Sequence, residues 1–304
     1  MKKFKIIAYI LLITITLLIG TTIFVKANED EEKSQRQKAL TEIKYLDAKL
    51  EDLFNEMNNI TMRNYKVYTS NIEQTKKGAS NAASENSSSS DSGNSKSSNQ
   101  TTSNEQGESN QSNEDEKNLK NYTMQQKGVL TNTDVIDWDK VKNEVELIYT
   151  SIPAITLDLY ALNINQDEIL NFNRQFDNLT VLVKNQNKEE TLRELAKMYQ
   201  YIPKFANTII DDVIYKTVLN VKSNIFLAYS KLDSKNWNEI SDDVKNAINI
   251  FSKLLNANVI NMNNQTTINK VYVMLNELQN AINVKDEEVF LIKYKNLLEE
   301  INNM

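Results

Sequence analysis

The stretch ALTEIKYLDAKLEDLFNEMNNI, residues 39–60, decides the fold of this chain. Its apolar residues recur at alternating steps of four and three, the spacing of a heptad seam along one face of a helix. A helix with such a face has to bury it, and we therefore expect one long amphipathic helix over residues 30–75. The seam consists of Ile43, Leu46, Leu50, Leu53, Met57 and Ile60, with Ala39 before them and Val67 after them.

Two kinds of partner could cover this seam. A second copy of the helix would give a dimeric stalk, whereas the C-terminal part of the same chain would give a bundle. Phe54, Tyr65, Tyr68 and Ile72 widen the apolar stripe beyond a two-position seam, which favours the bundle. The seam is also the candidate docking site for a protein partner, whose identity the sequence does not indicate. The oligomeric state stays open.

An apolar segment precedes this helix. Residues 6–25 carry no charge, lysines stand before them and an acidic run follows at residues 29–32. Such a segment is long enough to cross a bilayer of about 30 Å, and basic residues in front place the N-terminus inside. We expect residues 1–5 in the cytoplasm, a membrane anchor at residues 6–25 and an extracytoplasmic remainder.

A signal peptide is the alternative interpretation of this segment. Val25-Lys26-Ala27 has small residues at the two positions that a signal peptidase reads. Cleavage after Ala27 would release a secreted protein instead of a single-pass membrane protein. A lipid anchor on cysteine is excluded, because the chain has no cysteine.

Residues 76–118 consist mainly of Ser, Asn, Gly, Thr, Gln and Glu. A segment with so few apolar side chains cannot bury enough surface to offset its chain entropy, and we expect a disordered linker. A flexible chain of this length reaches about 40 Å. The amphipathic helix could therefore fold back onto the C-terminal domain, residues 119–304.

The C-terminal domain contains a weak internal repeat with a period of about 50 residues, which predicts stacked helix hairpins. Residues with cap-forming side chains precede each expected helix, at Asp137, Asn187, Asn236 and Asp286. The units are expected at residues 138–186, 188–235 and 237–284, with breaks at 163–165, 207–212 and 258–264 and a closing helix at 286–304. The repeat motif pairs Tyr149, Ile152 and Pro153 with Tyr199, Ile202 and Pro203.

The composition favours an all-α fold and narrows the chemistry. Five Gly and two Pro in 304 residues are few for sandwiches, barrels or nucleotide-binding folds. The absence of His and Cys excludes the usual neutral-pH base, thiol nucleophiles, Cys or His zinc sites and disulfides. The formal net charge is −6, and without the lysines of residues 1–27 it is more negative. Such a surface repels nucleic acid.

Paired carboxylates are the remaining candidates for catalysis, since two of them could hydrolyse a glycosidic bond. Neighbouring residues on a helix point in different directions, however, and a helix N-terminus favours acids in its first turn. We therefore predict no catalytic residue, no metal site and no cofactor. The pairs are Glu189-Glu190, Asp211-Asp212, Asp242-Asp243, Glu287-Glu288 and Glu299-Glu300.

These features predict an all-α chain with a membrane helix, a long amphipathic helix, a disordered linker and a bundle or short solenoid of about three hairpins. The expected function is non-enzymatic binding or scaffolding at the cell surface. One alternative is a ligand-sensing bundle that acts through a partner. The other is a cell-wall enzyme that uses carboxylates.

Overall fold

The computed structural model describes residues 31–62, 128–132, 134–255 and 262–304. In these residues the chain is helical and contains no strand. The predicted all-α class is thus confirmed for the described part. The expected anchor at residues 6–25 and the expected linker at residues 76–118 lie outside it. No helix among the described residues has both the length and the apolar character needed to cross a membrane.

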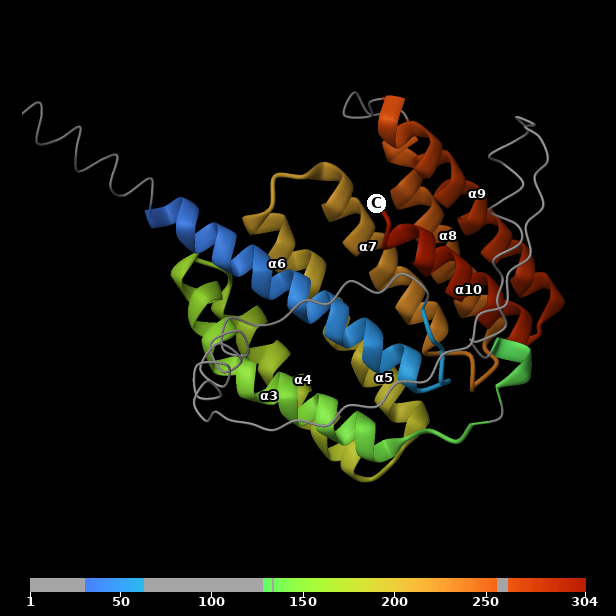
Figure 1. Cartoon of the computed structure of the whole chain (residues 1–304), viewed down its shortest axis with the longest axis horizontal. Helices are drawn as coiled ribbons and strands as arrows, with labels where there is room; N and C mark the ends of the chain where they lie inside the picture. Colours follow the sequence, from blue (N-terminus) through green and yellow to red (C-terminus); the bar gives the residue numbers. More distant parts are fainter. Residues whose placement is uncertain (1–30, 63–127, 133, 256–261) are drawn as a thin grey trace, which may run out of the picture.

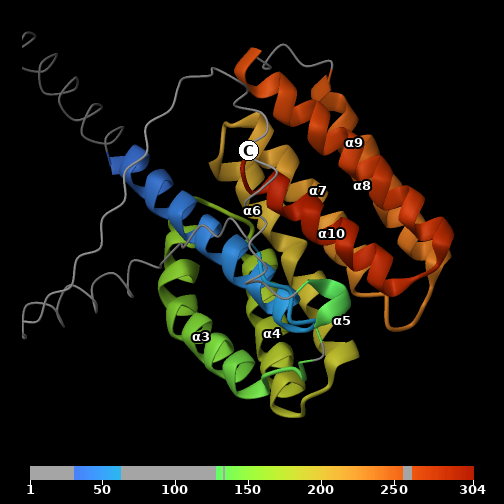
Figure 2. The same ribbon diagram turned by 45° about the vertical axis from the view of Figure 1, so that its right-hand side comes forward.

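A helix at residues 31–56, called the central helix from here on, crosses the molecule between α3 and α10 (Figures 1 and 2). A 3₁₀ turn, η1 (Val129–Thr131), precedes the other helices in the described chain. Those helices are α3 (Trp138–Ala161), α4 (Gln166–Lys184), α5 (Lys188–Tyr199), α6 (Tyr201–Ile209), α7 (Val213–Tyr229), α8 (Trp237–Leu255), α9 (Met262–Val284) and α10 (Glu287–Ile301).

Helices that follow one another along the chain pack side by side, as α3 does with α4, α7 with α8 and α9 with α10. The central helix joins the two ends of this series, because its side chains bind partners on α3, α5, α7 and α10. No residue between Ala39 and Ile60 is exposed. The central helix is therefore the core element of the bundle.

Side-chain caps start the helices where the sequence places cap formers. Asp137, Asn187 and Asp286 each accept a hydrogen bond from the backbone N–H three residues later, at 3.0, 3.2 and 2.9 Å. Asn236 makes the same contact at 3.5 Å. Each cap satisfies a backbone donor that the first helical turn leaves unpaired. The four predicted helix starts coincide with these caps.

Helix ends use residues other than glycine in the left-handed conformation. Asn163, Gln186, Lys235 and Lys285 have φ of 57°, 55°, 52° and 55°. The last three each stand directly before a helix-starting cap residue. Because a Cβ disfavours this conformation, each such end stores strain that a glycine would avoid.

The central helix ends earlier than the sequence predicts. The expected helix ran to residue 75, but the observed helix stops at residue 56 and a turn follows at residues 57–59. Asn59 adopts φ of 49°, and the Ile60 N–H binds the Asn55 carbonyl at 2.8 Å. This hydrogen bond closes a Schellman motif, which asparagine tolerates better than most residues. Residues 63–75 lie outside the described chain.

The second predicted hairpin is also divided differently. Its first arm forms two helices, α5 and α6, which meet at Gln200. Pro203 follows in the first turn of α6, where its missing N–H is tolerated, whereas Pro153 lies inside α3. The same Ile-Pro pair thus accompanies a helix break in one arm and a continuous helix in the other.

Candidate functional site

The central helix buries a row of polar residues beside its apolar seam. Asp47, Glu51 and Asn55 follow one another at steps of four, so they share one face, and each is at most 8% exposed. Buried polar groups are costly unless they are hydrogen-bonded or paired. The partners of this row therefore decide whether its burial is tolerated.

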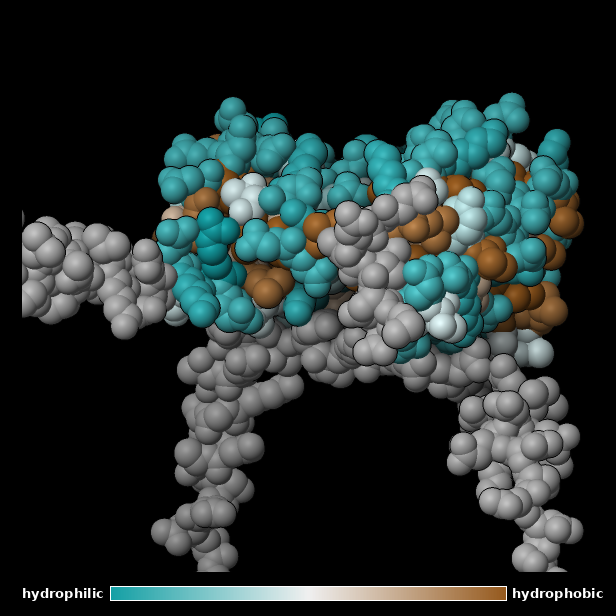
Figure 3. All heavy atoms as spheres, turned by 90° about the horizontal axis from the view of Figure 1, so that it is seen from above, coloured by the Kyte–Doolittle hydropathy of each residue, from teal (hydrophilic) through white to brown (hydrophobic). Residues whose placement is uncertain are grey.

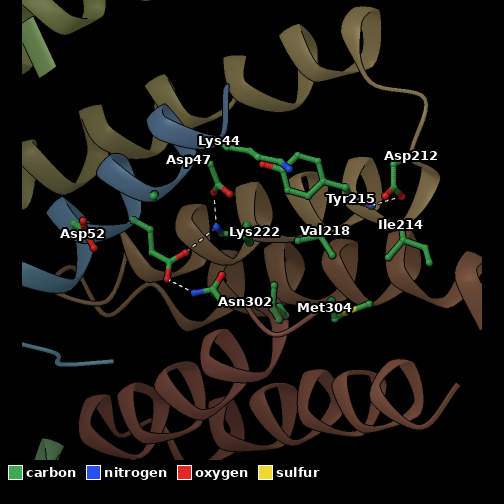
Figure 4. A pocket seen from close by; sticks show the side chains of 13 residues that line it. Lys44, Asp47, Asp52, Asp212, Ile214, Tyr215, Val218, Lys222, Asn302 and Met304 are labelled. Carbon is green, nitrogen blue, oxygen red and sulfur yellow. Dashed lines mark hydrogen bonds and ion pairs between the residues drawn. The ribbon is translucent and has the colours of Figure 1, made fainter. Parts of the chain in front are cut away.

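Lys222 of α7 lies at the centre of this region, and its side chain is 2% exposed. Its Nζ donates to Glu51 Oε2 at 2.7 Å and also to Asp47 Oδ1. Tyr199 of α5 donates its hydroxyl to Asp47 at 2.5 Å, and the Asn302 amide donates to Glu51 at 2.6 Å. Figure 4 shows Lys222 beside Asp47, with dashed lines for the two ion pairs of its Nζ. We call Asp47, Glu51 and Lys222 the buried triad.

For both Lys222 and Glu51, burial and ion pairing shift the pKa in opposite directions. Burial opposes the charged form of Lys222, but Asp47 and Glu51 outweigh it and the pKa of Lys222 is raised. Burial also raises the pKa of Glu51, and repulsion from Asp47 adds to this effect although Lys222 attracts the charge. The raised pKa values of Lys222 and Glu51 are both consistent with one ammonium that is shared by two carboxylates. The triad has a net charge of −1 when all three groups are ionised.

A cavity of about 230 Å³ lies against the triad. Three parts of the chain line it: the central helix, the segment from Asp212 into α7, and the end of α10 with the residues after it. Lys44 lies over the ring of Tyr215 at 5.5 Å on one side of this cavity. The other lining residues are Asp47, Ala48, Glu51, Asp52, Asp212, Ile214, Val218, Lys222, Ile301, Asn302 and Met304.

Aromatic rings fill the core next to the triad. Phe54 of the central helix stacks on Phe226 of α7, with 4.3 Å between ring centroids. Tyr199 meets the edge of Phe226 at 4.6 Å, and Tyr229 stacks on Tyr294 of α10 at 4.7 Å. This cluster and the triad together hold the central helix against α5, α7 and α10.

The six predicted seam residues are all buried in the hydrophobic core of this chain. The seam thus faces the other helices of the same chain, as the intramolecular alternative expects. Its use by a separate partner stays a prediction. The six are Ile43, Leu46, Leu50, Leu53, Met57 and Ile60.

The two copies of the repeat motif have different surroundings. Tyr199, Ile202 and Pro203 are buried, but Tyr149 is 47% exposed and Pro153 is exposed as well. Tyr149 donates its hydroxyl to Asp177 of α4 at 2.7 Å and lines a shallow groove between α3 and α4. The motif therefore marks equivalent positions in sequence that do not share one structural role.

The paired acidic residues are mostly held by neighbouring groups. Glu189 and Glu190 lie in the first turn of α5, where both bind Arg193. Asp243 binds Lys231, and Glu300 binds Lys270. Within the described residues no group of acidic side chains could hold a metal ion.

Sequence reasoning missed the buried triad, although a signal for it exists. Lys222 stands in the run VLNVKSNIF, residues 218–226, where its neighbours at helical spacing are apolar. A lysine on the apolar face of a helix needs an anionic partner, and the acids beside the seam at Asp47 and Glu51 are suitable. Which of the many acids would pair with it depends on how distant helices pack.

The surface view from above in Figure 3 is mainly hydrophilic. Hydrophobic residues are more frequent at the right-hand end of that view, where α8 and α9 lie in Figure 1. No protein-family profile, no curated protein and no solved structure matches this chain. Its function therefore has to be inferred from the residues and their geometry.

Proposed function

We propose that this chain is a membrane-tethered, extracytoplasmic protein with a non-enzymatic binding role at the cell surface. The tether would be residues 6–25, whose apolar character and flanking charges favour a span with the N-terminus inside. The described part of the central helix starts at residue 31, shortly after that segment. The tether would thus lead almost directly into the core of the binding domain.

The observation that carries the binding role is the cavity next to the buried triad. Ligand sites are concave, contain apolar walls and place a few polar groups for orientation. This cavity combines the side chains of Ile214, Val218 and Met304 with charged groups from the central helix and α7. Two of the carboxylates that line the cavity, those of Asp47 and Glu51, already bind Lys222, which supports a structural role for them over proton transfer.

Protease treatment of intact cells without their wall tests the location. We expect an added protease to digest the chain beyond about residue 28, since the domain would face outward. A C-terminal domain that survives until the membrane is permeabilised would contradict the proposed topology.

A thermal-melt screen with small amines, carboxylic acids, sugars and phosphates tests the binding role. A ligand of the cavity should raise the melting temperature of the wild-type chain, because it binds only the folded state. Ala48→Phe places a ring in the cavity and should abolish that increase. If no compound class stabilises the wild type, or if Ala48→Phe responds equally, the cavity is not the binding site.

One observation favours a sensing role as a second candidate. The cavity is lined by the central helix, α7 and the end of α10, so a bound molecule would contact all three. The first of these leads toward the expected anchor. A ligand that binds this junction could change how firmly the tethering helix is held, and a partner would then transmit the change.

A further inference from the structure

The buried triad holds two carboxylates and one ammonium away from solvent. Lys222 Nζ donates to Glu51 at 2.7 Å and also to Asp47, and the lysine side chain is 2% exposed. When all three groups are ionised, one negative charge has no cationic counterpart. A surplus charge is costly in a buried site, and a carboxyl group removes it by taking up a proton.

The groups around Glu51 provide no second cation for it in the described part of the chain. On the central helix, Lys44 lies instead over the ring of Tyr215, 5.5 Å from the ring centroid. On α10, Lys295 lies 4.0 Å from Glu299. Neutralisation of the surplus charge by another described side chain is therefore not observed, and a proton is the simplest counter-charge.

The other titratable neighbours of Glu51 are acidic or neutral. Asp52 and Asp212 line the cavity beside it, so they add negative charge to this region. Tyr199 and Tyr294 also interact with Glu51, but burial raises the pKa of both phenols and keeps them neutral. These neighbours oppose a second ionised carboxylate in the triad.

Hydrogen-bond partners select Glu51 as the carboxyl group that can take up the proton. Asp47 accepts from two donors, Lys222 Nζ and the Tyr199 hydroxyl. Glu51 contacts Lys222 through Oε2, whereas its Oε1 accepts from the Asn302 amide at 2.6 Å. An amide carries an oxygen as well as an NH₂ group, so Asn302 can also accept from a protonated Oε1. Glu51 can thus gain a proton and keep both partners.

We propose that the buried triad is a proton switch centred on Glu51. One proton from solvent adds to Glu51 Oε1, the amide of Asn302 turns over, and the new hydroxyl donates to Asn302 Oδ1 while Lys222 keeps its bond to Oε2. The cavity lined by Glu51 and Asn302 gives solvent access to this oxygen. The protonated triad is neutral, so it holds the central helix against α7 and the end of α10 more firmly. The switch does not require a ligand in the cavity.

The sign of the pH dependence follows from where the proton is bound. A glutamate in the unfolded chain has a pKa of about 4.3, and burial raises the pKa of Glu51 in the folded chain. Between the two values only the folded chain holds the proton. Stability from this group is therefore greatest on the acid side of the window and falls as the pH rises through the folded-state pKa. Within the window, each pH unit changes the unfolding constant by up to about tenfold.

Urea denaturation of the wild type and Glu51→Gln between about pH 4 and pH 8 tests the switch. Glutamine imitates the protonated carboxyl group, because its amide can donate to Asn302 and accept from Lys222. The ratio of unfolding constants, wild type over Glu51→Gln, should rise with pH and level off above the folded-state pKa. A ratio that is constant or falls with pH would overturn the proposal.

Glu277→Gln is the matched control. Glu277 of α9 is exposed and pairs with Lys293 at 2.9 Å, which lowers its pKa. Above about pH 5 this carboxylate is ionised in the folded and in the unfolded chain, so the ratio of wild type over Glu277→Gln should not change with pH there. If this ratio rises as it does for Glu51→Gln, the pH dependence is not specific to the triad and the proposal fails.

Carbon-13 NMR of the wild-type chain keeps the switch testable if Glu51→Gln does not fold. The Cδ signal of Glu51 should titrate at a higher pH than that of Glu277, and the side-chain NH₂ signals of Asn302 should shift with the same midpoint as Glu51. A Glu51 midpoint at or below the ordinary value of about 4.3 contradicts proton uptake by the triad. Asn302 signals that ignore the titration of Glu51 contradict the turning of its amide.

Discussion

Lys222 of α7 donates to Glu51 of the central helix at 2.7 Å, in a site where both side chains are less than 10% exposed. The two residues come from segments far apart in the chain. Their contact, together with Asp47, fixes the position of the central helix along α7. Buried ion pairs add little net stability compared with apolar residues, but they are costly to break because a charge is left alone.

Removing the cation of the triad should therefore destabilise the fold strongly. Lys222→Met leaves Asp47 and Glu51 buried without a counter-charge, and we expect a loss of about 3–5 kcal/mol in the free energy of unfolding. Urea denaturation measures this loss. Adding Asp47→Asn and Glu51→Gln to the variant should restore most of it, since no unpaired charge would remain.

Lys270→Met is the matched control for this experiment. Lys270 binds Glu300 at 2.6 Å, but its side chain is 58% exposed. Exposed ion pairs contribute about 1 kcal/mol or less, so this variant should stay close to the wild type. Equal losses in both lysine variants would mean that the triad has no special role.

Alkaline pH should lower the free energy of unfolding, because three buried tyrosines and Lys222 keep their protons in the folded chain. Burial raises the pKa of Tyr199, Tyr229 and Tyr294, and the two triad carboxylates raise the pKa of Lys222. Above about pH 10 these groups lose protons in the unfolded chain but keep them in the folded one. The folded state then binds more protons, so stability falls as the pH rises.

Urea denaturation between neutral pH and pH 12 measures this dependence. Each group that stays protonated only in the folded state steepens the decrease by about 1.4 kcal/mol per pH unit. Tyrosinate absorbance of the three buried tyrosines should appear together with unfolding. Ionisation of all tyrosines near pH 10 in a chain that remains folded would contradict their burial.

Truncating the seam should cost far more than truncating an exposed leucine. Leu50 of the central helix is fully buried, and Leu50→Ala should lower the free energy of unfolding by about 2–5 kcal/mol. Leu170 of α4 is 51% exposed, and Leu170→Ala should change it by about 0.5 kcal/mol or less. Thermal denaturation of the two variants compares them directly. Similar small effects would place Leu50 outside the core.

A glycine should relieve the strain at the end of α9. Lys285 has φ of 55°, and its N–H binds the Ile282 carbonyl at 3.0 Å. The left-handed conformation costs a residue with a Cβ about 1 kcal/mol, and glycine avoids this cost. Part of the gain in stability is lost, because glycine also makes the unfolded chain more flexible. We expect Lys285→Gly to leave stability unchanged or to raise it by up to about 1 kcal/mol. A clear loss in thermal denaturation would argue against the strained end.

The sequence was sufficient to predict the features that depend on short-range chemistry. Asp137, Asn187, Asn236 and Asp286 were recognisable as caps, because a cap contacts backbone only three residues away. The seam around Leu50 was recognisable from its period alone. The separation of α5 and α6 at Gln200 could not be recognised in this way. The Ile-Pro pair that follows Gln200 also occurs inside α3, which is continuous.

The candidate site could not be predicted in the same way. Asp47 and Glu51 look like ordinary polar neighbours of a heptad seam, and Lys222 looks like one lysine among many. Their relationship appears only when the central helix and α7 are placed side by side. The end of the central helix was missed because Asn58 and Asn59 can continue a helix or close it, and the Schellman hydrogen bonds decide between the two.

Zero-length carbodiimide cross-linking of the native chain tests the central claim that the helix at residues 31–56 packs inside its own bundle. This reagent joins a lysine to a carboxylate that it already contacts. Lys38 of the central helix lies 2.7 Å from Asp158, and Lys49 of the same helix lies 2.8 Å from Glu144. Asp158 and Glu144 both belong to α3. Lys231, in the turn after α7, lies 2.7 Å from Asp243 of α8, and this pair serves as the positive control.

The reaction is carried out on an equal mixture of unlabelled and nitrogen-15-labelled protein and analysed by mass spectrometry. We predict that the Lys38–Asp158 and Lys49–Glu144 products combine peptides of the same isotope, as the Lys231–Asp243 product must. If those two products contain both isotopes, or fail to form while the control product does, the central helix does not pack within its own chain.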